Sequence, residues 1–114
     1  MGKDFLQLTG NDDNALEFNK RGGVGAIGVT ANVAAKLASD FQKACLEDFN
    51  RATELDKLLQ PLHSSLFIES NPSPVKYAAS LLGMCKPNVR LPLVEIRDET
   101  KKKVSEALKV AKLL

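Results

Sequence analysis

The fold is decided by the stretch Gly22-Gly23-Val24-Gly25-Ala26-Ile27-Gly28-Val29-Thr30. Its second part, residues 25–30, is small and apolar and does not alternate with polar residues, which is typical of a strand covered on both faces. Upstream, Phe5-Leu6-Gln7-Leu8-Thr9 forms another short apolar run, which ends at Gly10. The sequence therefore predicts two strands, at residues 5–9 and 25–30.

A short helix is predicted between the two strands. Residues 11–13 (Asn-Asp-Asp) can cap its start, and Lys20 and Arg21 lie in its last turn before the pair Gly22-Gly23. Acids at the start and cations at the end suit the helix dipole, and a terminal glycine suits a left-handed C-cap. A strand, a helix and a strand in this order predict a parallel pair with a right-handed crossover.

The rest of the chain is predicted to be mostly helical. Apolar residues recur at helical spacing in three segments, at 33–46, 50–68 and 98–113. Pro61 lies inside the second segment and predicts a kink or a break there.

Two more helix boundaries follow from capping residues. Ser73 is expected to cap a helix that has Pro74 in its first turn and ends before Gly83. Asp98 is expected to cap the last helix. Residues 84–97, which contain two prolines, are expected to form an extended connector.

Composition excludes several classes of partner. The 114 residues carry 16 basic and 14 acidic side chains, a balance too even to favour nucleic acid or an anionic membrane surface. No stretch approaches the ~18–20 apolar residues that span a bilayer, and residues 1–4 do not resemble a signal peptide. Cys45 and Cys85 lie far apart in sequence and form no metal-binding or redox motif, so we expect free thiols in a reducing compartment. We therefore predict a cytoplasmic chain without a membrane or nucleic-acid partner.

Individual motifs indicate no chemistry. Residues 23–28 match GxGxxG, but they follow a helix and enter a strand, whereas a dinucleotide site needs the opposite order. His63 is the single histidine and has no second ligand at metal spacing, so we expect a solvated or capping side chain and no metal site. Asp12 and Asp13 can act as general bases, but carboxylates at a helix start also serve stability alone. We predict no catalytic residue, no metal and no cofactor.

The predicted strands pose a physical problem. Two parallel strands make a poor sheet, because strands of this type need cover on both faces and neighbours at both edges. The pattern indicates a chain organised for more strands than it contains. The alternative is a helical domain that tolerates a two-stranded ribbon.

The same residues resemble the C-terminal portion of the dihydrodipicolinate synthase family, the pyruvate-dependent Schiff-base lyases and aldolases related to N-acetylneuraminate lyase. The resemblance covers essentially the whole chain. It is carried, in order, by residues 8–13 (Leu-Thr-Gly-Asn-Asp-Asp), 22–33, 61–63 (Pro-Leu-His), 66–69 (Leu-Phe-Ile-Glu), 71–76 (Asn-Pro-Ser-Pro-Val-Lys) and 90–93 (Arg-Leu-Pro-Leu).

The resemblance implies an α/β fold, a partial TIM (β/α) barrel followed by a C-terminal helical domain and mostly α by content. Residues 4–10 and 25–30 would be its seventh and eighth strands. Residues 1–47 would hold the last two β/α units, and residues 48–114 the helical domain.

Two residues carry over to the expected substrate pocket, which in such barrels lies at the carboxyl ends of the strands. Gly10 and Ile27 match positions whose backbone groups face the substrate. Three positions depart from the family: Asn11, where relatives often have an acid, Gly28, where a serine is common, and Arg21, where an apolar residue can sit at a subunit contact.

The resemblance also implies the reaction. The family condenses pyruvate with aspartate semialdehyde, in lysine biosynthesis, after a lysine amine forms a Schiff base with pyruvate. That lysine belongs to the sixth strand, upstream of residue 1. We therefore expect a fragment that is inactive alone and binds these substrates only when the missing barrel half completes it, with an oligomer or a complementing chain as partner.

Two other hypotheses remain open. A non-catalytic remnant would act as a helical oligomerisation or interaction module, because exposed strands and apolar helix faces find partners. An anion or nucleotide site at the helix start after Thr30 has only the general chemistry of helix termini in its favour.

Overall fold

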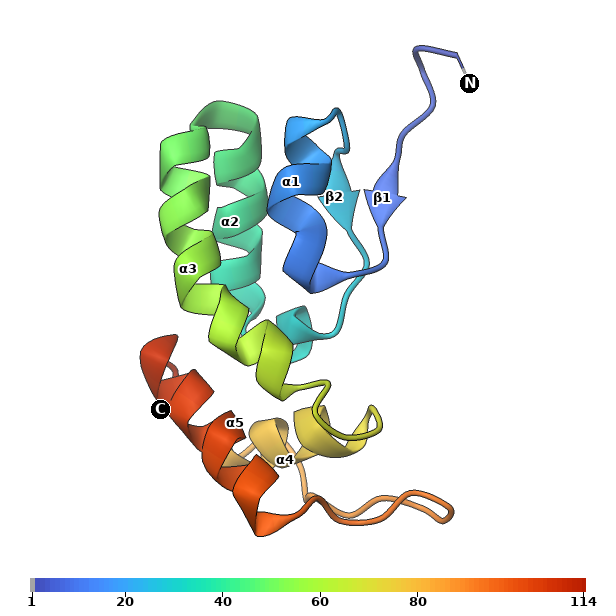
Figure 1. The fold of residues 1–114 in the computed structure, drawn as a ribbon, viewed down its shortest axis with the longest axis vertical. Helices are drawn as coiled ribbons and strands as arrows, with labels where there is room; N and C mark the ends of the chain where they lie inside the picture. Colours follow the sequence, from blue (N-terminus) through green and yellow to red (C-terminus); the bar gives the residue numbers. More distant parts are fainter. Residues whose placement is uncertain (1) are drawn as a thin grey trace.

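A computed structural model describes residues 2–114 and is drawn in Figure 1. Within them a pair of very short strands and two 3-10 turns accompany five α-helices. Along the chain these are β1 (Leu8–Thr9), η1 (Asp12–Asn14), α1 (Ala15–Lys20), β2 (Gly25–Ala26), η2 (Thr30–Asn32), α2 (Ala35–Glu47), α3 (Phe49–Ser65), α4 (Ser73–Leu81) and α5 (Asp98–Val110).

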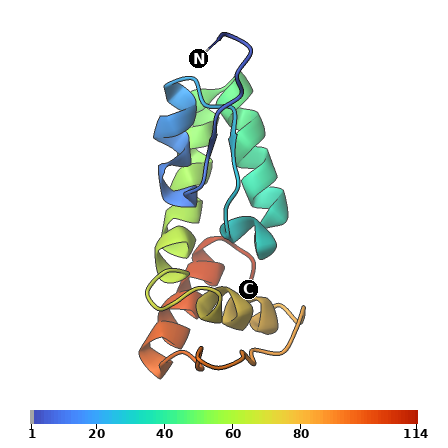
Figure 2. The same cartoon turned by 90° about the vertical axis from the view of Figure 1, so that its right-hand side faces the viewer.

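The two strands are parallel, as predicted, with Leu8 paired to Gly25 and Thr9 to Ala26. Both are shorter than the predicted ranges. One further hydrogen bond extends the pairing at each end, from the Val24 N–H to the Gln7 carbonyl at 3.0 Å and from the Ile27 N–H to the Thr9 carbonyl at 2.9 Å. Figure 2 shows the pair side by side along one face of the molecule, with the helices behind. Residues that have no neighbouring strand on their outer side cannot form ladder hydrogen bonds there, which explains why both strands are short.

Helix α1 ends as the glycine predicts. Gly22 has φ +102°, and the Gly23 N–H donates to the Phe18 carbonyl at 3.0 Å, which satisfies a terminal carbonyl of the helix. The predicted cap at its start is wrong. Neither Asn11 nor Asn14 makes a side-chain cap bond, because the chain enters α1 through η1.

Helices α2 and α3 form a hairpin with Asp48 as its single connecting residue. The Asp48 carboxylate accepts hydrogen bonds from the Asn50 N–H at 3.0 Å and the Arg51 N–H at 3.3 Å, so it caps α3. Helix α3 runs through Pro61 to Ser65 without a break. Its axis bends in its second half, so a kink replaces the alternative of a break (Figure 1).

The last two helices pack beside the end of α3 (Figure 1). The predicted caps are again displaced: Ser73 is the first residue of α4, with Pro72 before it, and Asp98 is the first residue of α5, with Arg97 before it. Neither Pro72 nor Arg97 makes a side-chain cap bond. The chain between Gly83 and α5 contains no helix or strand, as expected for the connector.

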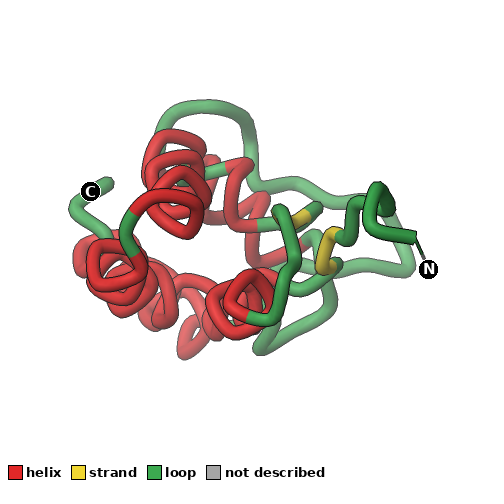
Figure 3. The backbone as a smooth tube through the Cα atoms, turned by 90° about the horizontal axis from the view of Figure 1, so that it is seen from above, coloured by secondary structure: helices red, strands yellow, loops and turns green. Residues whose placement is uncertain are grey.

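One hydrophobic core runs through the helices. Its centre is the apolar stripe of α3, which is buried as the helical spacing predicts, at Ala52, Leu55, Leu59 and Leu62, and which continues to Leu66 directly after the helix. The predicted inward residues of α5 are buried too, at Val104, Ala107, Leu108 and Ala111. Figure 3 shows the strands at one side of this helical body. The chain is therefore mostly helical, with its strand pair at the periphery.

The division at residue 48 falls within the α2–α3 hairpin, whose two helices share this core. The division itself stays a prediction. None of the described helices is long and apolar enough to cross a membrane.

Candidate active site

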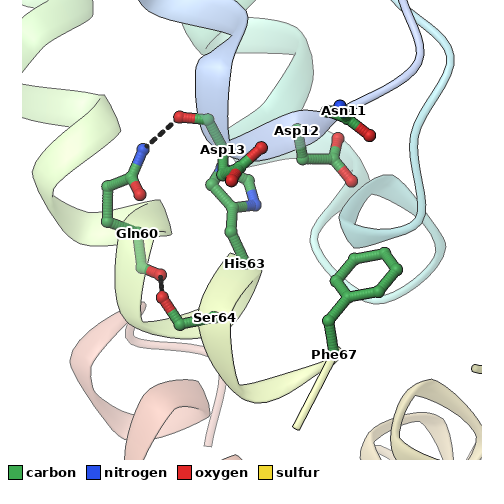
Figure 4. Close-up of a pocket in the computed structure, with 7 residues that line it drawn as sticks. All are labelled: Asn11, Asp12, Asp13, Gln60, His63, Ser64 and Phe67. Atoms are coloured by element: carbon green, nitrogen blue, oxygen red, sulfur yellow. Dashed lines mark hydrogen bonds between the residues drawn. The ribbon is translucent and has the colours of Figure 1, made fainter. Parts of the chain in front are cut away.

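The segments that follow the two strands meet at one edge of the pair, because parallel strands end on the same side. A pocket with a volume of about 290 Å³ opens there. It lies between η1, which follows β1, and the second half of α3 (Figure 4). Its lining residues are Asn11, Asp12, Asp13, Gln60, His63, Ser64 and Phe67.

The carboxylate of Asp12 supports the backbone that leaves β2. Its Oδ2 atom accepts two hydrogen bonds, from the Val29 N–H at 2.6 Å and from the Thr30 N–H at 3.0 Å. The sequence leaves open whether Asp12 acts as a base or serves stability. The geometry favours the structural role, because one carboxylate oxygen is engaged by two backbone donors.

Gly28 lies directly against this carboxylate. A Cβ atom at residue 28 would overlap Asp12 Oδ1, Cγ and Oδ2. A side chain at position 28 would therefore displace the Asp12 carboxylate from its two bonds, while the departure from a common serine stays a prediction.

The prediction for His63 is wrong. The side chain is neither solvated nor a cap: the residue is 5% exposed, and its Nδ1 atom lies 2.7 Å from Thr30 Oγ1. Thr30 itself is completely buried. Burial lowers the pKa of His63, while the negative charges of Asp12, Asp56 and Asp13 act in the opposite direction. The imidazole is therefore uncharged at neutral pH.

A signal in the sequence could have found this position. His63 follows Leu59 by four residues, stands beside Leu62 and precedes Leu66 by three, so it shares their helix face. The polarity of the side chain favours solvent, whereas the periodicity favours burial, and the periodicity is the better guide here.

Gly10 and Ile27, the two residues predicted for the substrate pocket, each follow a strand directly. They lie at the same edge as the pocket but do not line it. Gly10 is exposed, and the Ile27 side chain is 73% exposed. Ile27 is held to the sheet through its N–H, which donates to Thr9. Their role toward a substrate stays a prediction.

The lysines of the described chain lie outside the two strands. None of these lysines is buried. The pKa of Lys101 is raised, first by its hydrogen bond to Glu95, which is the opposite of the change that activates an amine. Among the described residues no group of three His, Cys, Asp or Glu side chains could hold a metal ion.

Comparison with known proteins identifies the family. Residues 1–111 match the sequence model of the dihydrodipicolinate synthetase family. The chain belongs to this family. The resemblance drawn from the motifs is therefore confirmed.

Relatives within the dihydrodipicolinate synthetase family are similar over the whole chain. The 4-hydroxy-tetrahydrodipicolinate synthase of Pelagibacter ubique is 68% identical over 100% of the chain, and that of Parvibaculum lavamentivorans is 52% identical over 100%. Each match covers 40% of the relative. The chain thus spans about 40% of the length of these curated relatives.

Solved structures of the dihydrodipicolinate synthetase family have the same fold over this region. The dihydrodipicolinate synthase of Aquifex aeolicus is 41% identical, with a TM-score of 0.92 over 99% of this chain and 39% of its own. The enzyme of Acinetobacter baumannii, solved as a complex with pyruvate, is 34% identical, with a TM-score of 0.90 over 96% of this chain and 38% of its own.

Proposed function

We propose that this chain is the C-terminal part of a 4-hydroxy-tetrahydrodipicolinate synthase, which condenses pyruvate with aspartate semialdehyde through a lysine Schiff base. The observation that carries the proposal is the match in fold to the Aquifex aeolicus synthase, at a TM-score of 0.92, over nearly all of this chain but only 39% of that protein. The strands β1 and β2 would then be the last two strands of a TIM barrel, and residues 48–114 its helical domain.

The open edges of the strand pair support this arrangement. Leu8 is exposed in β1, Phe5 and Leu6 are exposed before it, and Val24 and Ile27 are exposed on either side of β2. Large apolar side chains at unpaired strand edges are a liability unless further strands cover them. Neighbouring barrel strands would supply that cover.

Within the enzyme, this chain would build one wall of the substrate pocket and leave the covalent chemistry to other segments. The backbone groups of Gly10 and Ile27 would face the substrate at the carboxyl ends of β1 and β2. The amine that attacks pyruvate would come from a preceding strand, because the lysines of this chain are exposed or half-exposed and lie outside both strands. Pyruvate and aspartate semialdehyde are accordingly substrates of the complete barrel.

Borohydride trapping tests this proposal. The complete natural polypeptide that carries this sequence is incubated with pyruvate, reduced, weighed intact and then digested. We expect one reduced pyruvate adduct, on a lysine that lies outside residues 1–114. The matched control is the 114-residue chain alone, which we expect to stay unmodified. An adduct inside residues 1–114, or condensation activity of the 114-residue chain by itself, would refute the assignment of roles.

A second candidate, a helical interaction module, is favoured by one observation: the core continues from α2 through α3 to α5 without the strands taking a large part in it. Such a module would be a stable, monodisperse protein by itself. Absence of any pyruvate adduct on the natural polypeptide would favour it over the synthase.

A further inference from the structure

Thr30 is held from several directions at the point where the chain turns from β2 into η2. Its N–H donates to Asp12 Oδ2, its carbonyl accepts from the Ala34 N–H at 2.9 Å, and its hydroxyl bonds to His63. The residue is completely buried. A buried residue that is hydrogen-bonded through its N–H, its carbonyl and its hydroxyl has a closely defined backbone position.

The partner of the Thr30 hydroxyl comes from a rigid element. His63 is 33 positions away in sequence and belongs to α3, between residues of the buried stripe. Helix α3 packs against both α2 and α5. The Thr30–His63 hydrogen bond therefore connects the exit of β2 to the centre of the helical core.

Ile27 and Gly28 have little other support, whereas Val29 packs partly against the core and its carbonyl accepts hydrogen bonds from Asn32. Ile27 is bonded to Thr9 through its N–H, and its side chain is largely exposed, so side-chain packing does not fix it. Residues 27–29 thus span between two attachments: the Thr9 carbonyl on one side, and the Asp12 and His63 bonds on the other. Loss of the Asp12 or His63 hydrogen bonds would therefore also loosen the backbone of Ile27.

We propose that Thr30 and His63 are positioning residues, whose buried hydrogen bond fixes the backbone of residues 27–30 and so aligns Ile27 with the substrate pocket. Neither side chain touches the substrate in this proposal. Asp12 holds the same segment from the β1 side. The role of Ile27 rests on the proposed function, whereas the anchoring of residues 27–30 does not.

The test uses isosteric variants of the complete polypeptide. Thr30→Val removes the hydroxyl and keeps the shape, and Thr30→Ser is the matched control that keeps the hydroxyl. His63→Leu removes the ring nitrogen, and His63→Asn restores a polar atom near the place of Nδ1. Amide hydrogen exchange is followed by mass spectrometry in peptides that cover residues 24–33 and, for comparison, α3 and α5.

We expect Thr30→Val and His63→Leu to raise exchange in residues 27–33 about fivefold, the factor that corresponds to the net worth of one hydrogen bond. Amide exchange in the core of α3 and α5 should stay at the wild-type rate in Thr30→Val. The control variants Thr30→Ser and His63→Asn should keep most of the protection from exchange at residues 27–33. An unchanged rate at residues 27–33, or an equal rise in α5, would overturn the anchor and leave only a general effect on stability.

Kinetic measurements distinguish the anchoring of residues 27–30 from its effect on substrate binding. In an active synthase, Thr30→Val should raise the KM for pyruvate several-fold, with Thr30→Ser near wild type. Faster exchange with unchanged KM and kcat would overturn the positioning role. Faster exchange in a polypeptide that forms no pyruvate adduct would refute the proposed function and still support the anchor. A spectroscopic check is the ¹⁵N shift of His63 Nδ1, which should change in Thr30→Val, because that nitrogen loses its hydrogen-bond partner.

Discussion

The contact between Gly28 and the Asp12 carboxylate determines which residue position 28 can hold. Gly28→Ala would push the carboxylate away from the Val29 and Thr30 N–H groups. We expect a loss of about 1–3 kcal/mol in the free energy of unfolding, the usual cost of overpacking. Gly10→Ala is the matched control, because a Cβ there meets no atom within 4 Å. Urea unfolding of both variants measures the difference, and equal losses would contradict this account.

The pKa of His63 predicts how stability depends on pH. Its folded pKa lies below the ordinary value of 6.5, so between the two values the unfolded chain binds more protons than the folded chain. The contribution of His63 is therefore complete above pH 6.5 and declines as the pH falls toward the folded pKa. The opposing charges of Asp12, Asp13 and Asp56 limit its size.

Urea unfolding of wild type and His63→Asn over a pH series isolates this effect, since other groups cancel in the difference. We expect the difference in unfolding free energy to shrink as the pH is lowered. A difference that is constant with pH would mean that His63 does not titrate differently in the folded state.

The two cysteines should differ in reactivity. Cys45 is buried and Cys85 is exposed. Burial raises the pKa of the Cys45 thiol, although its contact with Asn19 acts in the opposite direction, and the thiolate is the reactive form. Limited iodoacetamide treatment of the folded protein should label Cys85 well before Cys45, and both should react in urea. Peptide mapping gives the order, and earlier labelling of Cys45 would show that α2 opens readily.

At the scale of single residues, few side-chain contacts can be predicted from the sequence. The repeat of Val33, Leu37, Phe41 and Cys45 places Cys45 on a buried face, where the structure has it. His63 lies on the buried face of α3 by the same spacing. A polar side chain is buried there only if it finds a hydrogen-bond partner, and its partner Thr30 is distant in sequence, so the pair cannot be predicted from the helix alone. The bonds to the Asp12 carboxylate depend equally on how β1 and β2 are brought together.

At the scale of elements, the start of α3 depends on one residue. Asp48 accepts hydrogen bonds from two free N–H groups of the first turn. Asp48→Ala should lower the unfolding free energy by about 1 kcal/mol. The adjacent acid gives a control: Glu47 is exposed, and its side chain makes no hydrogen bond within the described part of the chain, so Glu47→Ala should change the value by less than ~0.5 kcal/mol. Thermal or urea unfolding checks both, and similar losses would show that the cap is unimportant.

Sequence patterns predict the kind of each element better than its extent. Buried helix faces follow from spacing, because a helix places every third or fourth residue on one side. Capping propensity alone places helix starts at residues 11–13, Ser73 and Asp98, but α1 begins only at Ala15, and Ser73 and Asp98 lie inside the first turn of their helices. The lengths of the strands are overestimated for another reason. An apolar run shows which residues could join a sheet, whereas the strand that forms also depends on which neighbouring strands are present.

At the scale of the whole molecule, the exposed apolar edge of the strand pair is the main unsatisfied feature. The 114-residue chain alone should therefore self-associate through Phe5, Leu6, Leu8, Val24 and Ile27, because unpaired strand edges and apolar patches find partners. An edge variant that combines Leu6→Lys with Val24→Lys should weaken this association by placing charge at the edge. A connector variant that combines Leu91→Lys with Val94→Lys is the matched control, since these residues are also exposed but precede α5.

Sedimentation of the wild type and the two variants over a concentration series measures the effect. We expect oligomers or aggregates for the wild type and the connector variant, and a shift toward monomer for the edge variant. The reason is physical: the helices share one core, whereas the strand pair gathers five exposed apolar residues beside unpaired strand edges. A monodisperse wild-type monomer would show that the helical core suffices alone, and would favour the interaction module over a barrel segment that needs its neighbouring strands.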